Sequence, residues 1–150
     1  MSSLVHFEDV EVGETRRFGR YEVTAEEIIE YARQFDPQPF HIDEEAARQS
    51  MFGGLIASGW HTGAMFIRMV CEHLVPGTAT TGAVGFDDLK WLKPVRPGDI
   101  LSVESTVREK IDSPSRRGLG TVKIDSRVLN QRNEAVMTLT SLVLYRRRRA

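Results

Sequence analysis

Apolar and polar positions follow different periods in the two halves of this chain. In the first half, apolar residues recur every three or four positions, which is typical of amphipathic helices. In the second half they alternate with polar residues, which is typical of strands that bury one face. We therefore expect helices before about residue 75 and mainly strands after about residue 82.

The first helix is expected to begin after Thr24 and to end before Pro37. Thr24-Ala25-Glu26-Glu27 has the form of a capping box, in which the threonine hydroxyl accepts from the Glu27 amide and the Glu27 side chain reaches back. The residue before a proline is pushed towards extended geometry, so Pro37 closes the helix. A short helix should follow from Asp43, because acidic residues in its first turn suit the helix dipole.

A longer helix is expected from about Ser58 to Val75, where Pro76-Gly77 stops it. Its apolar stripe keeps alternating steps of three and four residues. The stripe consists of Thr62, Met65, Phe66, Met69, Val70, His73 and Leu74. Cys71 also falls inside this apolar pattern, so we predict that both Cys71 and His73 are core residues rather than reactive groups.

Strands are expected over residues 15–23, 82–93, 101–107, 122–129 and 135–145, with a hairpin turn at 130–133. The order is one strand, then helices, then four strands, without alternation of strand and helix. This order predicts an α+β fold in which an antiparallel sheet packs against the long helix. One sheet on one helix leaves apolar surface uncovered, so a homodimer or a dimer-based oligomer is predicted.

Composition narrows the classes of function. The 150 residues suggest one domain, residues 1–150, with a single core, and a net charge of −1 gives no reason to expect nucleic acid. The basic run Arg146 to Arg149 is interpreted as a solvated tail after the last strand, and a loose contact to an anionic ligand or nucleic acid is the alternative. The single cysteine excludes an internal disulfide and favours a cytoplasmic setting. No apolar run is long enough to span a membrane, and no signal peptide is expected.

Residues 35–43, F-D-P-Q-P-F-H-I-D, hold an acid and an imidazole on one stiff loop. Pro37 and Pro39 each fix one backbone angle, which lowers the cost of presenting Asp36 and His41 in one geometry for acid–base chemistry. The alternative is a structural turn in which Asp36 caps backbone amides and His41 lies hydrogen-bonded at the surface. Nearby acids at Asp43 and Glu44 fit no metal-binding spacing, so no metal is expected.

Three stretches of the sequence, in order, resemble the MaoC-like dehydratases, the (R)-specific enoyl-CoA hydratases. Asp36 to Asp43 resembles their Asp-x-Asn-Pro-x-His signature, with the same five-residue step from acid to histidine. Phe52 to Gly59 is similar to the segment that follows it, and Trp91 to Asp99 resembles a later strand-and-turn signature. Because these stretches fall in order and at the distances usual in the family, they tie down most of the chain, and the set is specific to the family.

The resemblance implies a hotdog fold, a curved antiparallel sheet wrapped around a long helix and paired with a second copy. It also implies reversible addition of water to a trans-2-enoyl thioester of CoA or of a carrier protein, giving an (R)-3-hydroxyacyl thioester, with no cofactor. By this resemblance Asp36 activates the water, and His41 holds it and delivers a proton to the α-carbon. Gly59, at the start of the long helix, would supply a backbone N–H to the oxyanion, where glycine lets a thioester approach closely.

The chain departs from the family pattern at three positions. Gln38 stands where asparagine is usual, and the resemblance gives that residue the role of ordering the loop. Ser58 stands where histidine is frequent, and a serine there could cap the helix. Trp60 stands where methionine is frequent; its indole either enters the acyl tunnel, which would shorten the substrate range, or enters the core.

Further candidates for substrate contact are weaker. His61 is either a pocket residue or a histidine that faces a neighbouring loop. Lys93 and Arg96, beside two proline turns, are candidates for the phosphates of the carrier, since the chain has no glycine-rich phosphate loop. A hotdog thioesterase remains an alternative. Its common forms place one carboxylate on or near the long helix, but the only carboxylate on this helix is Glu72, late in the helix. A protein that binds acyl thioesters without turnover is the other alternative, and retention of Asp36 and His41 argues against it.

Overall fold

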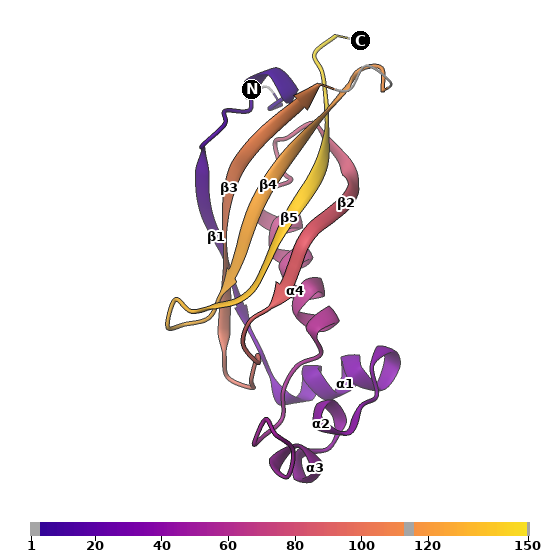
Figure 1. Cartoon of the computed structure of the whole chain (residues 1–150), viewed down its shortest axis with the longest axis vertical. Helices are drawn as coiled ribbons and strands as arrows, with labels where there is room; N and C mark the ends of the chain where they lie inside the picture. Colours follow the sequence, from indigo (N-terminus) through magenta and orange to yellow (C-terminus); the bar gives the residue numbers. More distant parts are fainter. Residues whose placement is uncertain (1–3, 113–115, 150) are drawn as a thin grey trace.

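The computed structural model describes residues 4–112 and 116–149. Five antiparallel strands form one curved sheet in the order β1-β3-β4-β5-β2, and α4 packs against one face of it (Figure 1). The strands are β1 (Thr15–Glu22), β2 (Thr80–Trp91), β3 (Ile100–Asp112), β4 (Leu119–Leu129) and β5 (Ala135–Arg146). The helices are η1 (Phe7–Asp9), α1 (Ala25–Phe35), α2 (Pro39–Ile42), α3 (Glu44–Arg48) and α4 (Gly59–His73). This is the α+β hotdog arrangement expected from the sequence.

The alternating pattern correctly predicted which face of the sheet is buried. In β3, Leu101 and Val103 are fully buried, while the residues between them are partly exposed. They pack against Met65 and Met69 of α4, and burying a side chain of this size contributes about 1.5–3 kcal/mol to stability. At Gly19 the chain has φ of +89°, and a Cβ there would lie 2.6 Å from the Met69 sulfur. The glycine therefore lets β1 bulge closely over α4.

The short helices confirm some expectations and correct one. Thr24 caps α1, because its hydroxyl accepts from the Glu27 amide at 3.2 Å. The second half of the predicted capping box is wrong, since the Glu27 carboxylate instead bonds to Tyr21 and His61. Asp43 caps α3 by accepting from two amides of its first turn, as expected for a helix that starts there. The single-turn helix α2 inside the proline loop was not predicted.

The far end of α4 corrects two further predictions. Four of the stripe residues are buried as expected: Thr62, Met65, Phe66 and Met69. Cys71, however, is exposed, and the His73 side chain is 45% exposed, so neither is a core residue. A helical period identifies one face of a helix, but it does not say how far along that face the sheet extends.

The interpretation of the C-terminal arginines as a solvated tail is wrong in part. Arg147 pairs with Asp112, and Arg148 pairs with Asp9 of η1, so part of the run is neutralised within the chain. Arg147 also lies over the ring of Phe7, 4.6 Å from its centroid. Both ends of the chain lie at the end of the sheet away from α1, α2 and α3 (Figure 1).

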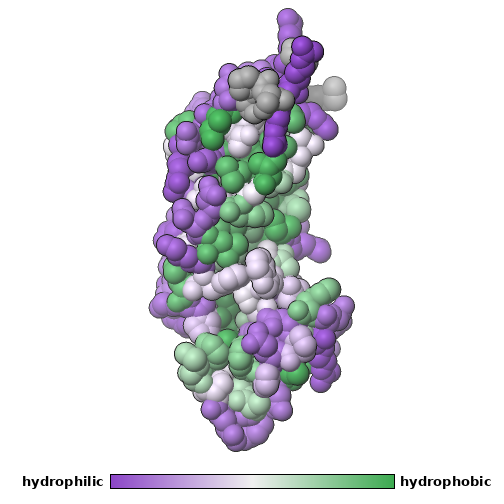
Figure 2. Space-filling model, turned by 45° about the vertical axis from the view of Figure 1, so that its right-hand side comes forward, coloured by the Kyte–Doolittle hydropathy of each residue, from purple (hydrophilic) through white to green (hydrophobic). Residues whose placement is uncertain are grey.

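A broad apolar surface lies along α4 and the edge strand β2, and Figure 2 shows apolar side chains gathered in a band along this side of the molecule. Ile67 on α4 is 45% exposed, and Val84 and Phe86 on β2 are 48% and 47% exposed. Ile67 and Phe86 border two apolar hollows of about 180 and 460 Å³. Across the described ranges, no helix has the length and apolar character needed to cross a membrane.

Candidate active site

The proline loop brings Asp36 and His41 together. Pro37 ends α1, so Asp36 becomes its C-terminal cap with φ of −155°, outside the helical region. Pro39 then starts α2 at its first position, where the missing N–H is not needed. This single turn carries His41 back towards Asp36, and His41 Nε2 lies 3.4 Å from Asp36 Oδ2.

The Asp36 carboxylate is held on both of its oxygens. Gln38 donates from its amide to Oδ1 at 2.6 Å, and Ser58 donates from its hydroxyl to Oδ2 at 2.6 Å. Burial raises the pKa of Asp36, but the hydrogen bonds from Ser58 and Gln38, together with the charge of His41, outweigh it and hold the pKa below its ordinary value. Asp36 is therefore ionised at neutral pH and available as a base.

The protonation pattern of His41 follows from its neighbours. The ring is 4% exposed, and its Nδ1 lies 2.8 Å from the carbonyl oxygen of Ile56. A carbonyl oxygen only accepts, so Nδ1 must carry a hydrogen. Nε2, which faces Asp36, is therefore the ring nitrogen that can gain or lose a proton. This is the arrangement that proton transfer requires.

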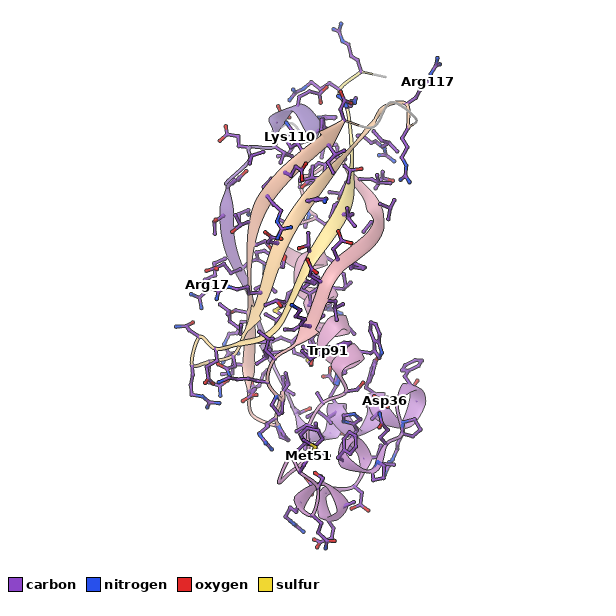
Figure 3. All side chains as sticks on the ribbon, viewed as in Figure 1. Arg17, Asp36, Met51, Trp91, Lys110 and Arg117 are labelled. Atoms are coloured by element: carbon purple, nitrogen blue, oxygen red, sulfur yellow. The ribbon has the colours of Figure 1, made fainter. Side chains whose placement is uncertain are left out.

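A groove of about 440 Å³ opens at this pair. Aromatic and apolar side chains form much of its wall, including Phe40, Phe52, Trp60, Trp91 and Leu92. Figure 3 places Asp36 and Trp91 where the helical end of the molecule meets the sheet. An apolar groove with a few convergent polar groups is the usual form of a small-molecule site.

Gly59 lines the groove. We expected a glycine there to let a thioester approach the backbone, but in the structure it makes room for the Trp91 side chain. A Cβ at Gly59 would lie 2.5 Å from the indole of Trp91, so no other residue fits beneath that ring. The Trp91 indole N–H also donates to the Gly59 carbonyl oxygen at 2.8 Å. The Gly59 N–H belongs to the first turn of α4, where amides lack partners within the helix and the dipole favours negative charge.

Ser58, Trp60 and His61, which flank or follow Gly59, make different contacts from those expected or left open by the sequence. Ser58 occupies the cap position of α4, but its hydroxyl bonds Asp36 and caps no amide, so the predicted capping role is wrong. Trp60 lines the groove, is 64% exposed and meets Trp91 edge-on, so it does not enter the core. His61 does not line this groove: it contacts Glu27 and Tyr31 of α1.

Only one of the two basic candidates lines the groove. Lys93 lines the groove and forms an ion pair with Glu134 at 2.6 Å. Arg96 donates to the Phe52 carbonyl at 2.6 Å, which ties the turn after β2 to the loop after α3. Their cationic groups are thus engaged within the chain. Among the described residues, no group of three or more His, Cys, Asp or Glu side chains could hold a metal ion.

Sequence reasoning missed two contributors to the site. Trp91 lies in the segment that resembles the later family signature, but the sequence assigned it no role. Its packing against Gly59 is visible only in the structure. The Ile56 carbonyl sets the protonation pattern of His41, and no side-chain motif could have identified a backbone acceptor. The positions of Asp36, Gln38 and His41 in one cluster agree with the proline loop read from the sequence.

Comparisons with known proteins agree with this geometry. A family model described as a MaoC-like domain matches residues 8–130. A 3-hydroxybutyryl-CoA dehydratase of Methylorubrum extorquens is 35% identical over 116 residues, which are 76% of this chain and 69% of that protein. The uncharacterized protein YdeM of Bacillus subtilis is 31% identical over 91% of this chain and 95% of its own length.

Solved structures give the same result. The crystal structure of a MaoC-like dehydratase from Rhodospirillum rubrum superposes with a TM-score of 0.88 at 44% identity, over 97% of this chain and 99% of that one. An (R)-hydratase from Pseudomonas aeruginosa superposes with a TM-score of 0.75 at 25% identity, over 95% of this chain and 86% of that one.

Proposed function

This chain belongs to the MaoC-like dehydratase family, and we propose that it adds water reversibly to a trans-2-enoyl thioester, giving an (R)-3-hydroxyacyl thioester. The observation that carries the proposal is the Asp36–His41 pair at 3.4 Å, beside the groove and the first turn of α4. The thioester of CoA or of a carrier protein is the substrate, and no cofactor takes part.

The proposed step begins with Asp36 ionised, His41 carrying a hydrogen on each ring nitrogen, and a water molecule hydrogen-bonded to both Asp36 Oδ2 and His41 Nε2. Asp36 takes a proton from the water while the oxygen bonds to C3 of the substrate, and the double-bond electrons move to the thioester oxygen. The Gly59 N–H stabilises the oxyanion that results. His41 then gives the Nε2 proton to C2, and Asp36 returns its proton to Nε2. The elements of water have been added, and both side chains are back in their starting states.

The geometry disfavours the thioesterase alternative. Glu72, the carboxylate on α4, lies thirteen residues after Gly59, which is roughly 20 Å along the helix. It is paired with Arg68 at an exposed position. His73 lies 3.9 Å from Glu72 there, but both side chains are nearly half exposed, and the groove that holds Asp36 and His41 is at the other end of α4. The features that hydration needs, a base beside an oxyanion donor, are at that other end.

We propose that the protein works as a homodimer or a dimer-based oligomer. The edge strand β2 and the neighbouring face of α4 expose apolar side chains that a second copy of the chain would cover (Figure 2). Light scattering at micromolar concentration should give at least twice the 17.0 kDa chain mass. A species of 17.0 kDa alone would remove this part of the proposal.

The reaction is tested with a panel of enoyl-CoA esters, from crotonyl-CoA to long and branched chains. We expect loss of enoyl absorbance with at least one ester and an (R)-configured product. Asp36→Asn serves as the control, because it keeps the shape and most hydrogen bonds of the side chain but removes the base. Release of free CoA thiol would instead indicate a thioesterase. Tight binding of an ester without turnover would indicate a non-catalytic binding protein.

A further inference from the structure

The helix α1 meets the first turn of α4 at two points. At one, Asp36 accepts the hydroxyl of Ser58. At the other, His61, three residues further along α4, contacts Glu27 and Tyr31 of α1. The proposed mechanism uses the first contact and leaves the second without a role.

His61 is held by two residues on one face of α1. Its Nε2 lies 3.0 Å from Glu27 Oε1, and its ring stacks on Tyr31 with centroids 4.5 Å apart and planes 9° from parallel. Glu27 and Tyr31 are four residues apart, so they are neighbours on the helix surface. Tyr21 donates to the same Glu27 oxygen and steadies the carboxylate from β1. The ring therefore has little freedom to move relative to α1.

The hydrogen bond to Glu27 fixes which nitrogen of His61 carries a hydrogen. A carboxylate accepts, so the His61 Nε2 carries the hydrogen shared with Glu27. His61 is 3% exposed, and its Nδ1 is buried with no hydrogen-bond partner in the part of the chain that the structure describes. A buried polar atom without a partner costs free energy and calls for an explanation. Contact with the Asp36 groove does not supply one, since His61 lies outside it.

We propose that His61 is a positioning residue for the hydration site. By holding the first turn of α4 against α1, it keeps Ser58 in hydrogen-bond reach of Asp36 and keeps the Gly59 amide at the groove. The effect on rate rests on the proposed function, whereas the effect on the Ser58–Asp36 contact does not require a substrate.

The distances explain why a small shift matters. Ser58 and His61 are three residues apart, which is roughly 4.5 Å along a helix, so a displacement at one is passed to the other almost undiminished. The Ser58–Asp36 hydrogen bond is 2.6 Å long, and a shift of about 1 Å would take it beyond useful length. Misplacements of about 1 Å can lower catalytic rates by up to about 100-fold.

The first test replaces His61 by leucine, which keeps similar bulk but removes the donor and the stacking ring. The matched control is His73→Leu, the same change in the last turn of α4, where the side chain is 45% exposed. With crotonyl-CoA, or the best ester of the panel, His61→Leu should lower kcat about 10-fold with KM within about two-fold. His73→Leu should leave both unchanged.

A second readout needs no turnover. The Asp36 carboxyl is titrated by carbon-13 NMR in the parent and in each variant. Loss of the Ser58 hydrogen bond removes an interaction that lowers the Asp36 pKa, so that pKa should rise in Ser58→Ala. It should also rise in His61→Leu, by a smaller amount, and stay at the parent value in His73→Leu. An unmoved Asp36 titration in folded His61→Leu overturns the positioning role.

The double mutant decides whether His61 acts through Ser58. In a Ser58→Ala background, His61→Leu should raise the Asp36 pKa no further, because the contact that it protects is already gone. A full additional rise contradicts the proposal. If His61→Leu does not fold, Tyr31→Leu removes the stacking partner from the other side and is expected to move Asp36 in the same direction. If the parent hydrates no ester, the proposed function fails while this titration still tests the contact.

Discussion

Two histidine–carboxylate pairs lie near the start of α4, and they differ in the hydrogen bonds that the two ring nitrogens of each histidine make. Both rings are almost fully buried, His41 at 4% and His61 at 3% exposed. His61 faces Glu27 of α1, and His41 faces Asp36, the residue that caps the C-terminus of α1. His41 binds a backbone carbonyl through Nδ1 and presents Nε2 to Asp36 at the groove. His61 commits Nε2 to Glu27 and buries Nδ1. The same two functional groups, an imidazole and a carboxylate, thus form a site for proton transfer in one place and a link between helices in the other.

Substitutions in the Asp36–His41 pair should lower the hydration rate more than any other change considered. Asp36→Asn and His41→Ala should each lower the kcat for hydration by about 10²- to 10⁴-fold, the range for a positioned acid or base. Both variants should keep the parent circular dichroism spectrum. The double mutant should fall by much less than the product of the single effects, since the two side chains serve one water and one proton transfer. An Asp36→Asn enzyme as fast as an active parent would make Asp36 a loop-capping residue.

The next effect concerns the pH dependence of the Asp36 pair. The ionised form of Asp36 is the base, and its pKa is held below the ordinary value, so activity should persist at acidic pH and fall as pH drops through that pKa. Ser58→Ala removes a hydrogen bond that lowers this pKa. The acid limb of kcat/KM should therefore move to higher pH, and kcat at neutral pH should fall about 10-fold. An acid limb that does not move would show that Ser58 leaves the base unaffected.

A smaller effect is expected at the two basic candidates, Lys93 in the groove and Arg96 outside its lining. Lys93→Ala and Arg96→Ala should each change KM for a CoA ester only a few-fold with kcat nearly constant, because exposed ion pairs contribute little. Steady-state kinetics on one ester separates the two parameters. A large fall in kcat at constant KM would contradict a role in binding the carrier. Arg132→Ala is a matched control, since it removes another cation that pairs with Glu134 outside the groove.

The smallest effect on the hydration rate is expected beside the second pair, His61 and Glu27. Burial, followed by the hydrogen bond to Glu27, raises the pKa of Tyr21 to about 12, so its phenol remains a donor throughout the working range of pH. Tyr21→Phe removes that donor but leaves the bond between Glu27 and His61. We expect a loss of about 1 kcal/mol in the free energy of unfolding, measured in urea, and a hydration rate within about two-fold of the parent. A large fall in rate would move Tyr21 from stability to function.

Local signals along the chain were enough to locate the helices and strands and to identify the acid and the imidazole of one short loop. Period and proline signals located α1, α4 and the strands, because these signals act between residues a few positions apart. The loop from Asp36 to His41 could be recognised for the same reason: its prolines, acid and imidazole stand within six residues. Membership of the MaoC-like family, inferred from three short stretches, followed from the same local information.

How these groups are used depends on contacts between segments that lie far apart in the chain. The partner that orients His41 lies 15 residues away, the serine that holds Asp36 lies 22 residues away, and Glu27 lies 34 residues from His61. Each of these contacts depends on how α1 and the loop before α4 pack, which no local pattern encodes. For the same reason Ser58 was taken for a helix cap and Cys71 for a core residue. Hydrogen-bond partners and burial belong to the packed chain, whereas periodicity belongs to the segment.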